Sequence, residues 1–222
     1  MAPVGCLRGV TPNLSSAQPA YYQIQFNGCA VGCGPTAWTM LFCWGDYQSA
    51  HGNAYWAPRN GPYRQNGGRG ADAVAPLIQD AGVENVMREL NGEVHTFCIF
   101  GSGATAPWDM PGAWSYLNGR TGTAARADWN SVGICQDWLR DRAIDSIVNR
   151  HTPAVIGTGW LTHFPMAFGY AWQTRTVRRS VLWWSWDETV TDRCLYVNEG
   201  WGGGGAGDWV DASTWFAGQI CP

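Results

Sequence analysis

Residues 33–44 read CGPTAWTMLFCW, an apolar run that begins with a cysteine. Apolar side chains at nearly every position are typical of a helix that is buried on all sides. Pro35 suits the first helical turn, where a missing N–H costs no hydrogen bond, and Gly45-Asp46 is expected to end the helix. The pattern therefore predicts a buried helix over residues 35–44 with the Cys33 thiol at its amino terminus.

A thiol at that place can serve as a nucleophile if a base lies beside it. Only the thiolate attacks efficiently, and both a helix amino terminus and a neighbouring imidazolium lower the pKa of a thiol. His163 begins an apolar, strand-like run over residues 163–172 and is predicted to be the general base for Cys33. The other histidines are expected to be solvated or half-buried, in a polar loop, in an alternating run and at a helix end: His51, His95 and His151.

Asn198 closes another strand-like run, residues 194–198, and is predicted to orient His163. Its side-chain carbonyl can accept a hydrogen bond from one imidazole nitrogen and so turn the other nitrogen toward the thiol. Trp201 is expected to cover that hydrogen bond and exclude water. If the glycine-rich segment that follows is aligned differently, Asp208 takes the place of Asn198. The glycines precede no Lys-Ser/Thr pair and open no helix, so a nucleotide site is not expected.

The organisation of the chain changes near residue 150. Before it we expect helices over 35–44, after Asp72 with Gly82 as its end, over 109–118 and over 134–148, with a long polar loop at 47–70 that borders the cleft. After it we expect strands at 154–160, 163–172, 181–186, 194–198 and 208–210, and a helical turn at 213–216. The prediction is a single α+β domain over 1–222, with a helical lobe at about 1–150 and a β lobe at about 151–222.

Charge and cysteine content narrow the class of protein. A net charge of −3, with no basic run longer than Arg178-Arg179, argues against nucleic-acid and anionic-membrane partners, and no apolar run is long enough to span a bilayer. The start of the chain lacks the pattern of a signal peptide. The eight cysteines form no CxxC pair, so we expect disulfides rather than zinc, and no metal or organic cofactor. If Cys33 is free, seven cysteines remain, and at least one more must be unpaired.

Four segments together resemble the streptopain-like branch of the papain-like cysteine peptidases, over most of the chain after Tyr21. They contain Gln23 with Phe26-Asn27, Gly32-Cys33 with Thr36-Ala37, His163 with Gly169-Tyr170, and residues 197–203, which read VNEGWGG. The resemblance implies a papain-like fold with an antiparallel β lobe and a secreted endopeptidase that is a monomer and acts on protein or peptide substrates. It also implies that the chain is the mature part of a zymogen.

Within that resemblance, a triad of Cys33, His163 and Asn198 forms an acyl-enzyme, and Gln23 helps to bind the oxyanion. Gln25 competes with Gln23 for this role, because the spacing to Cys33 leaves both open. Trp201 and Gly202 are expected to border the substrate.

Two other functions fit the same residues. A transglutaminase-like acyltransferase or a deamidase uses the same triad, and the fate of its acyl-enzyme depends on whether an amine or water enters the cleft. A catalytically inactive binding module could instead use some of the fifteen tryptophans to line a groove. Tryptophans within regular elements are more often core residues, which is expected of Trp38, Trp44, Trp114, Trp138 and Trp160. Of Trp183, Trp184 and Trp186, at least one must face outward.

Overall fold

The predicted helix over residues 35–44 is α1 (Cys33–Ala50) in the computed structural model, and it continues about one turn past Gly45-Asp46. It is buried on every side over most of its length, as its composition predicted. Gly45 does not end the helix. A β-carbon there would collide with the ring of Trp56, so glycine allows Trp56 to pack against the helix backbone.

The structure describes residues 18–53, 55–57, 59–66, 74–129, 133–202 and 207–221. These residues form a mixed α+β structure around one antiparallel sheet. None of the helices among them is long and apolar enough to cross a membrane.

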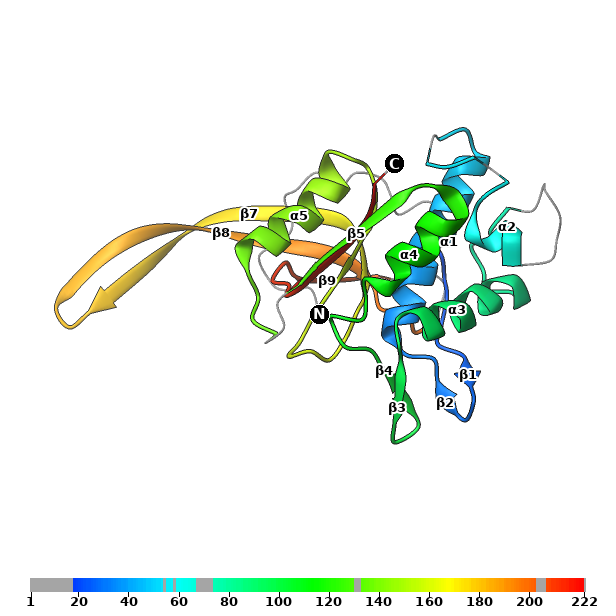
Figure 1. Ribbon diagram of the computed structural model, residues 1–222. Coiled ribbons are helices and arrows are strands. Elements are labelled where there is room, and N and C mark those ends of the chain that lie inside the picture. Colours follow the sequence, from blue (N-terminus) through cyan, green and yellow to red (C-terminus); the bar gives the residue numbers. More distant parts are fainter. Residues whose placement is uncertain are drawn as a thin grey trace.

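The main sheet has six strands in the order β5-β10-β6-β7-β8-β9. The strands are β5 (Ala124–Trp129), β6 (Ala154–Ile156), β7 (Met166–Val181), β8 (Trp184–Asn198), β9 (Asp208–Asp211) and β10 (Phe216–Cys221). Figure 1 shows β7 and β8 leaving the body of the molecule as one long hairpin. The predicted strand over 181–186 is therefore partly wrong, because Leu182 and Trp183 form the turn of this hairpin.

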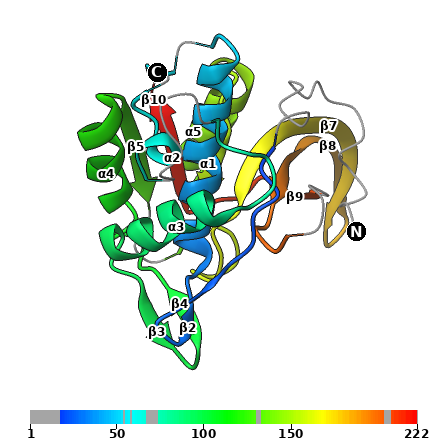
Figure 2. The same ribbon diagram turned by 90° about the vertical axis from the view of Figure 1, so that its right-hand side faces the viewer.

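Helices cover both faces of the sheet. Val155 and Met166 contribute to a core shared with α1, whereas their neighbours Ala154 and Ala167 pack with α5 (Asp137–Val148) on the other face. This division follows from the alternation of side chains along a strand. The first core also contains side chains of α3 (Ala81–Glu93) and α4 (Gly112–Thr121), which lie on the side of α1 in Figures 1 and 2.

The predicted helix that begins at Asp72 is wrong in its described part. Asp72 and Ala73 lie outside the described residues, and residues 74–80 form no helix. The helix is α3 instead, and it begins after Asp80, whose carboxylate accepts hydrogen bonds from the N–H groups of Gly82 and Val83. Asp80 is thus an N-cap, and Gly82 lies in the first turn of the helix that it was expected to end.

The division of the chain at residue 150 holds only in part. The predicted helices at 109–118 and 134–148 correspond to α4 and α5, but strand β5 precedes residue 150 and pairs with β10 along the whole of its length. Two small hairpins were also not predicted: β1 (Gln25–Phe26) with β2 (Cys29–Ala30), and β3 (Phe97–Ile99) with β4 (Ser102–Ala104). The helical turn expected at 213–216 is wrong, since β10 starts at Phe216.

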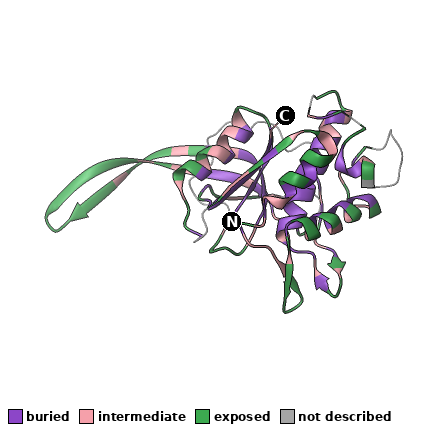
Figure 3. Ribbon diagram, viewed as in Figure 1, coloured by how far each residue is buried: buried purple, intermediate pink, exposed green. Residues whose placement is uncertain are grey.

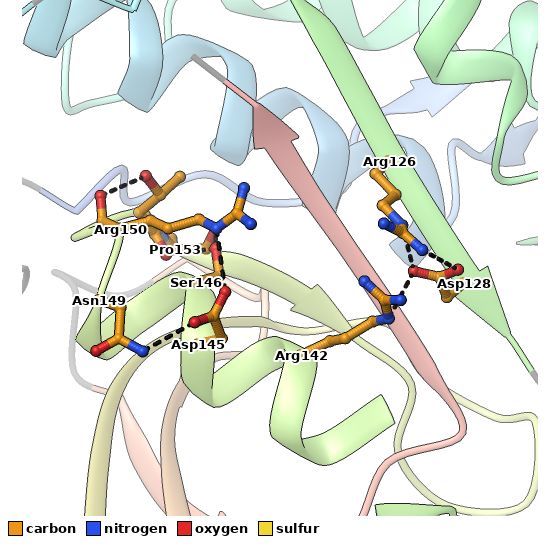
Figure 4. Close-up of polar contacts among 9 residues, drawn as sticks. Arg126, Asp128, Arg142, Asp145, Ser146, Asn149, Arg150 and Pro153 are labelled. Carbon is orange, nitrogen blue, oxygen red and sulfur yellow. Dashed lines mark hydrogen bonds and ion pairs between the residues drawn. The ribbon is translucent and has the colours of Figure 1, made fainter. Parts of the chain in front are cut away.

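An ion pair connects α5 to the sheet, and further polar contacts lie at the end of this helix (Figure 4). The Arg142 guanidinium on α5 lies 3.2 Å from the Asp128 carboxylate on β5, which also pairs with Arg126 at 2.8 Å. At the end of α5, Asp145 accepts hydrogen bonds from Asn149 and Arg150, and these contacts lower the pKa of Asp145. The Arg142–Asp128 ion pair thus connects α5 with the edge strand β5.

Two of the five tryptophans that were predicted to be core residues are buried, and the other three are exposed. Trp38 and Trp44 are fully buried, but Trp114, Trp138 and Trp160 are exposed. Figure 3 shows that the outer half of the β7–β8 hairpin is exposed on all sides.

The polar segment after α1 is anchored by a buried carboxylate. Asp46 accepts hydrogen bonds from the indole N–H of Trp56 at 2.6 Å and from the backbone N–H of Tyr63 in α2 (Pro62–Asn66) at 2.8 Å. Burial raises the pKa of Asp46 to about 7, against the opposing effect of these two donors. The described part of the 47–70 segment thus packs on α1, and its residues are not among those that line the cleft described below.

Replacement of Asp46 by alanine is expected to lower the free energy of unfolding by about 2–4 kcal/mol, because two buried N–H groups lose their acceptor. Urea denaturation checks this value. The matched control is Asp137→Ala at the exposed start of α5, where a change within about 0.5 kcal/mol is expected. Equal losses in the two variants would contradict a structural role for Asp46.

Candidate active site

Cys33 is the first residue of α1, and its surroundings explain the glycine before it. Gly32 has φ 93°, and a β-carbon on it would lie 2.9 Å from the carbonyl oxygen of Gly103. A side chain on Gly103 would in turn collide with the backbone of Ala30. Glycine at 32 and 103 therefore lets β4 pass directly against the start of the helix, beside the thiol.

His163 is held just before β7 and not within it, which corrects the predicted strand over 163–172. Its carbonyl accepts a hydrogen bond from the N–H of Thr158 at 2.9 Å, which closes a tight loop. Pro165 follows, and the strand begins at Met166. A proline cannot donate to a sheet, so this position at the start of the strand accounts for its presence.

Cys33 and Glu199 both contact the His163 imidazole. The Cys33 thiol is close enough to the ring to raise its pKa, and the ring Nε2 lies 2.6 Å from the Glu199 Oε2. The second contact is an ion pair without the alignment of a hydrogen bond. Burial lowers the pKa of His163, but the contacts with Cys33 and Glu199 outweigh it and raise the pKa to about 9. The imidazole is therefore charged at neutral pH.

Asn198 does not contact His163, which corrects its predicted orienting role. Its amide donates to the backbone carbonyl of Pro19 at 2.7 Å and to the side-chain Oε1 of Gln18 at 3.1 Å, and its own oxygen accepts from the N–H of Gly200. Asn198 thus holds the segment at Pro19 against the end of β8. The residue that faces the imidazole is its neighbour Glu199.

Trp201 lies beside His163, as expected, but at the rim of the site. The two rings are 5.7 Å apart and tilted by 45°, and the indole is 72% exposed. Gly202 donates its N–H to the carbonyl of Tyr21, and Tyr22 and Trp201 form an antiparallel bridge. Gly202 therefore connects its own segment to the one at Tyr21 and Tyr22, and it is not among the residues that line the cleft described below.

Residues from four parts of the chain line one cleft with a volume of about 590 Å³. Gln23 is among them, whereas Gln25 is exposed in the β1–β2 hairpin. The lining comprises Tyr22, Gln23, Ala30, Cys33, Ser102, Gly103, Thr162, His163, Gly200 and Trp201. The structure thus brings Cys33, His163, Gln23 and Trp201 together, with Glu199 against the imidazole.

A disulfide ties together the two hairpins that form one wall of the cleft. Cys29 on β2 is bonded to Cys98 on β3. The disulfide leaves Cys29 without a free thiol, so Cys29 cannot act as a nucleophile. The free cysteines among the described residues are Cys33, Cys43, Cys135 and Cys221. This confirms the prediction that at least one cysteine besides Cys33 is unpaired.

A larger hollow of about 920 Å³ lies between α5 and the base of the β7–β8 hairpin. Its lining shares no residue with the cleft and contains no cysteine. His151 lies at its edge, and His51, His95 and His151 are all exposed. Among the described residues, His163 is therefore the histidine that lines a cleft together with a free thiol.

No protein-family model matches the chain, and a search of curated proteins finds no relative of significant similarity. In the described ranges, no group of three or more histidine, cysteine or acidic side chains is arranged to hold a metal ion. The chemistry of the site must therefore be argued from its own geometry.

Proposed function

We propose that this protein is a cysteine peptidase that cleaves peptide bonds through Cys33, His163 and Glu199. The observation that carries this proposal is the half-buried imidazole placed between a free thiol and a carboxylate, in an open cleft. A nucleophile, a base in contact with it and a third group that orients the base are the parts that acyl transfer requires.

The steps follow from these contacts. In the resting site His163 already holds the proton of Cys33, so the thiolate sulfur attacks the scissile carbonyl, and the imidazolium then protonates the leaving amine as the C–N bond breaks. Water, deprotonated by His163, cleaves the resulting thioester and restores the thiol. Glu199 keeps the imidazole charged and directs Nε2 away from the thiol, so that Nδ1 remains for proton transfer.

The developing oxyanion needs hydrogen-bond donors in the same cleft. The first N–H groups of a helix lack acceptors within the helix, so the backbone N–H of Cys33 at the start of α1 is available. The side-chain amide of Gln23 lines the same cleft and is the proposed second donor.

We assign the chain to the papain-like fold, with secretion as a mature enzyme. Support for the fold comes from a cysteine at the start of a buried helix that shares a cleft with a histidine just before an inner strand of an antiparallel sheet. Support for secretion comes from the Cys29–Cys98 disulfide, since such bonds persist in oxidising compartments.

Labelling with a thiol-directed peptidyl epoxide tests the proposed nucleophile. At pH 6 we expect one equivalent to react, and mass mapping to place it on Cys33, because a thiolate–imidazolium pair remains reactive where an ordinary thiol near pKa 8.5 does not. Cys135 is the internal control. The residue is exposed, so the reagent can reach it. Partial desolvation of its thiol and the nearby Asp211 raise the pKa of Cys135, so it should stay unmodified. Equal labelling of Cys33 and Cys135, or a rate at Cys33 that only follows an ordinary thiol, contradicts the proposal.

A further inference from the structure

The outer part of the β7–β8 hairpin contacts no other element of the described chain along most of its length. Beyond Ala171 and Cys194, which are buried, no residue of either strand is buried and most are exposed (Figures 1 and 3). The ten residues from Trp172 to Val181 extend about 30 Å at about 3.3 Å per residue. The hairpin turn therefore stands well clear of the body.

Large apolar side chains gather at this free end. Leu182 and Trp183 form the turn and are 84% and 89% exposed. The pairing of Val181 with Trp184, and of Arg179 with Trp186, places Val181, Trp184 and Trp186 on one face of the hairpin. The apolar surface thus covers the end of the hairpin and one adjoining face. We call these five residues, Val181, Leu182, Trp183, Trp184 and Trp186, the hairpin tip.

Leu182 is an unfavourable residue for its backbone conformation. It has φ 54°, in the left-handed region, where two-residue hairpin turns favour glycine, asparagine or aspartate. A leucine there costs free energy that its side chain does not recover by packing, because the side chain is exposed. Such strain is a reason to look for a function of the side chain.

The charges next to the tip are neutralised within the hairpin. Arg179 pairs with Glu188 at 2.8 Å, Arg178 with Asp187 at 3.6 Å, and Arg175 with Asp192 at 2.6 Å. Three arginines thus face three carboxylates across the strands. The outer part of the hairpin, residues 175–192, thus presents apolar surface without a net charge, which does not suit nucleic acid or a strongly charged protein.

We propose that the hairpin tip inserts into the interface of a lipid bilayer. Tryptophan is the residue that is enriched at the boundary of headgroups and acyl chains, and leucine and valine prefer the region just below it. Because the hairpin tip protrudes, lipid can surround all of its apolar side chains. A flat protein surface would cover the hairpin tip from one side only. The proposal departs from the expectation of no membrane partner, which rested on charge and on the absence of a spanning segment.

The spacing along the hairpin fits this depth. In the charged pair Arg179–Glu188, Arg179 lies two residues behind Val181 and Glu188 four residues behind Trp184, which is about 7–13 Å. Peripheral elements bury their apolar side chains about 5–10 Å into the interface. With the tip inserted, this first ion pair therefore remains among the headgroups and in water.

Co-sedimentation of the intact chain with vesicles tests the proposal. We expect binding to pure phosphatidylcholine vesicles, and similar binding when phosphatidylglycerol is added, because the hairpin charges are paired. The triple variant Leu182→Asn, Trp183→Ser, Trp184→Ser should bind at least about tenfold more weakly, since it loses three apolar side chains. Asparagine tolerates the positive φ, so the variant should unfold at the same temperature as the unmodified chain.

The control is Phe100→Ser, at the turn of the β3–β4 hairpin. Phe100 is also a fully exposed aromatic residue with a positive φ, but its hairpin points in another direction (Figure 1). Binding should survive this change. An equal loss in both variants, no binding to either kind of vesicle, or binding that needs phosphatidylglycerol and survives the triple substitution would overturn the proposal. Self-association that the triple variant abolishes, without vesicle binding, would instead assign the tip to a second copy of the chain.

Discussion

Replacement of Cys33 by alanine is expected to lower the turnover of a peptide substrate by about 10⁵-fold or more, which is the scale of loss when a covalent nucleophile is removed. The reason is that no other free thiol among the described residues lines the cleft. The side chain is small and only partly buried, so the temperature of unfolding should not change appreciably. A fluorogenic peptide assay and thermal unfolding measure the two quantities.

The matched control for this variant is Cys135→Ala, which removes an exposed free thiol outside the cleft and should leave turnover unchanged. A Cys29→Ala variant is not a control, because it breaks the disulfide to Cys98 and loosens a wall of the cleft. Substantial activity in Cys33→Ala, with Cys135→Ala unaffected, would show that hydrolysis does not proceed through this thiol.

The nucleophile could be predicted from the sequence because its environment is local. The apolar run after Cys33 specifies a buried helix by itself, and Pro35 fixes the first turn. The place of His163 was also predictable, since it is the one histidine joined to a long apolar strand. Neither inference depended on how distant segments pair.

The third residue of the site could not be predicted in the same way. Successive side chains of an extended chain point to opposite sides, so only one of Asn198 and Glu199 can face His163. A shift of one residue in register exchanges them. The register here is set by pairing of Met166 with Asn198, and by the hydrogen bonds of Asn198 to Pro19 and Gln18, which lie about 180 residues earlier. No local pattern contains that information.

The same limit explains the errors in the fold. Val181 and Trp184 to Trp186 have the composition of one strand, and only a turn at Leu182, which is unfavourable for leucine, divides them into two. Strand β5 is separated in sequence from its partner β10 by about 90 residues. Local propensity predicted elements that stand alone, such as α1 and α5, and failed where a distant partner decides the structure.

Replacement of Glu199 by glutamine is expected to lower turnover by about 10²- to 10⁴-fold, the range seen when the residue that orients a catalytic histidine loses its charge. The change should also alter the pH profile. Cys33 and Glu199 raise the pKa of His163 from 6.5 to about 9, so activity that needs the imidazolium persists to about pH 9 and is lost above it. Without the carboxylate this pKa falls, and the basic limb of the profile of kcat/KM should move to lower pH.

Asn198→Ala is the matched control. Its hydrogen bonds go to Pro19, Gln18 and Gly200, so it should lower stability but leave the basic limb in place. A shifted limb in Asn198→Ala, with an unchanged limb in Glu199→Gln, would return the orienting role to Asn198.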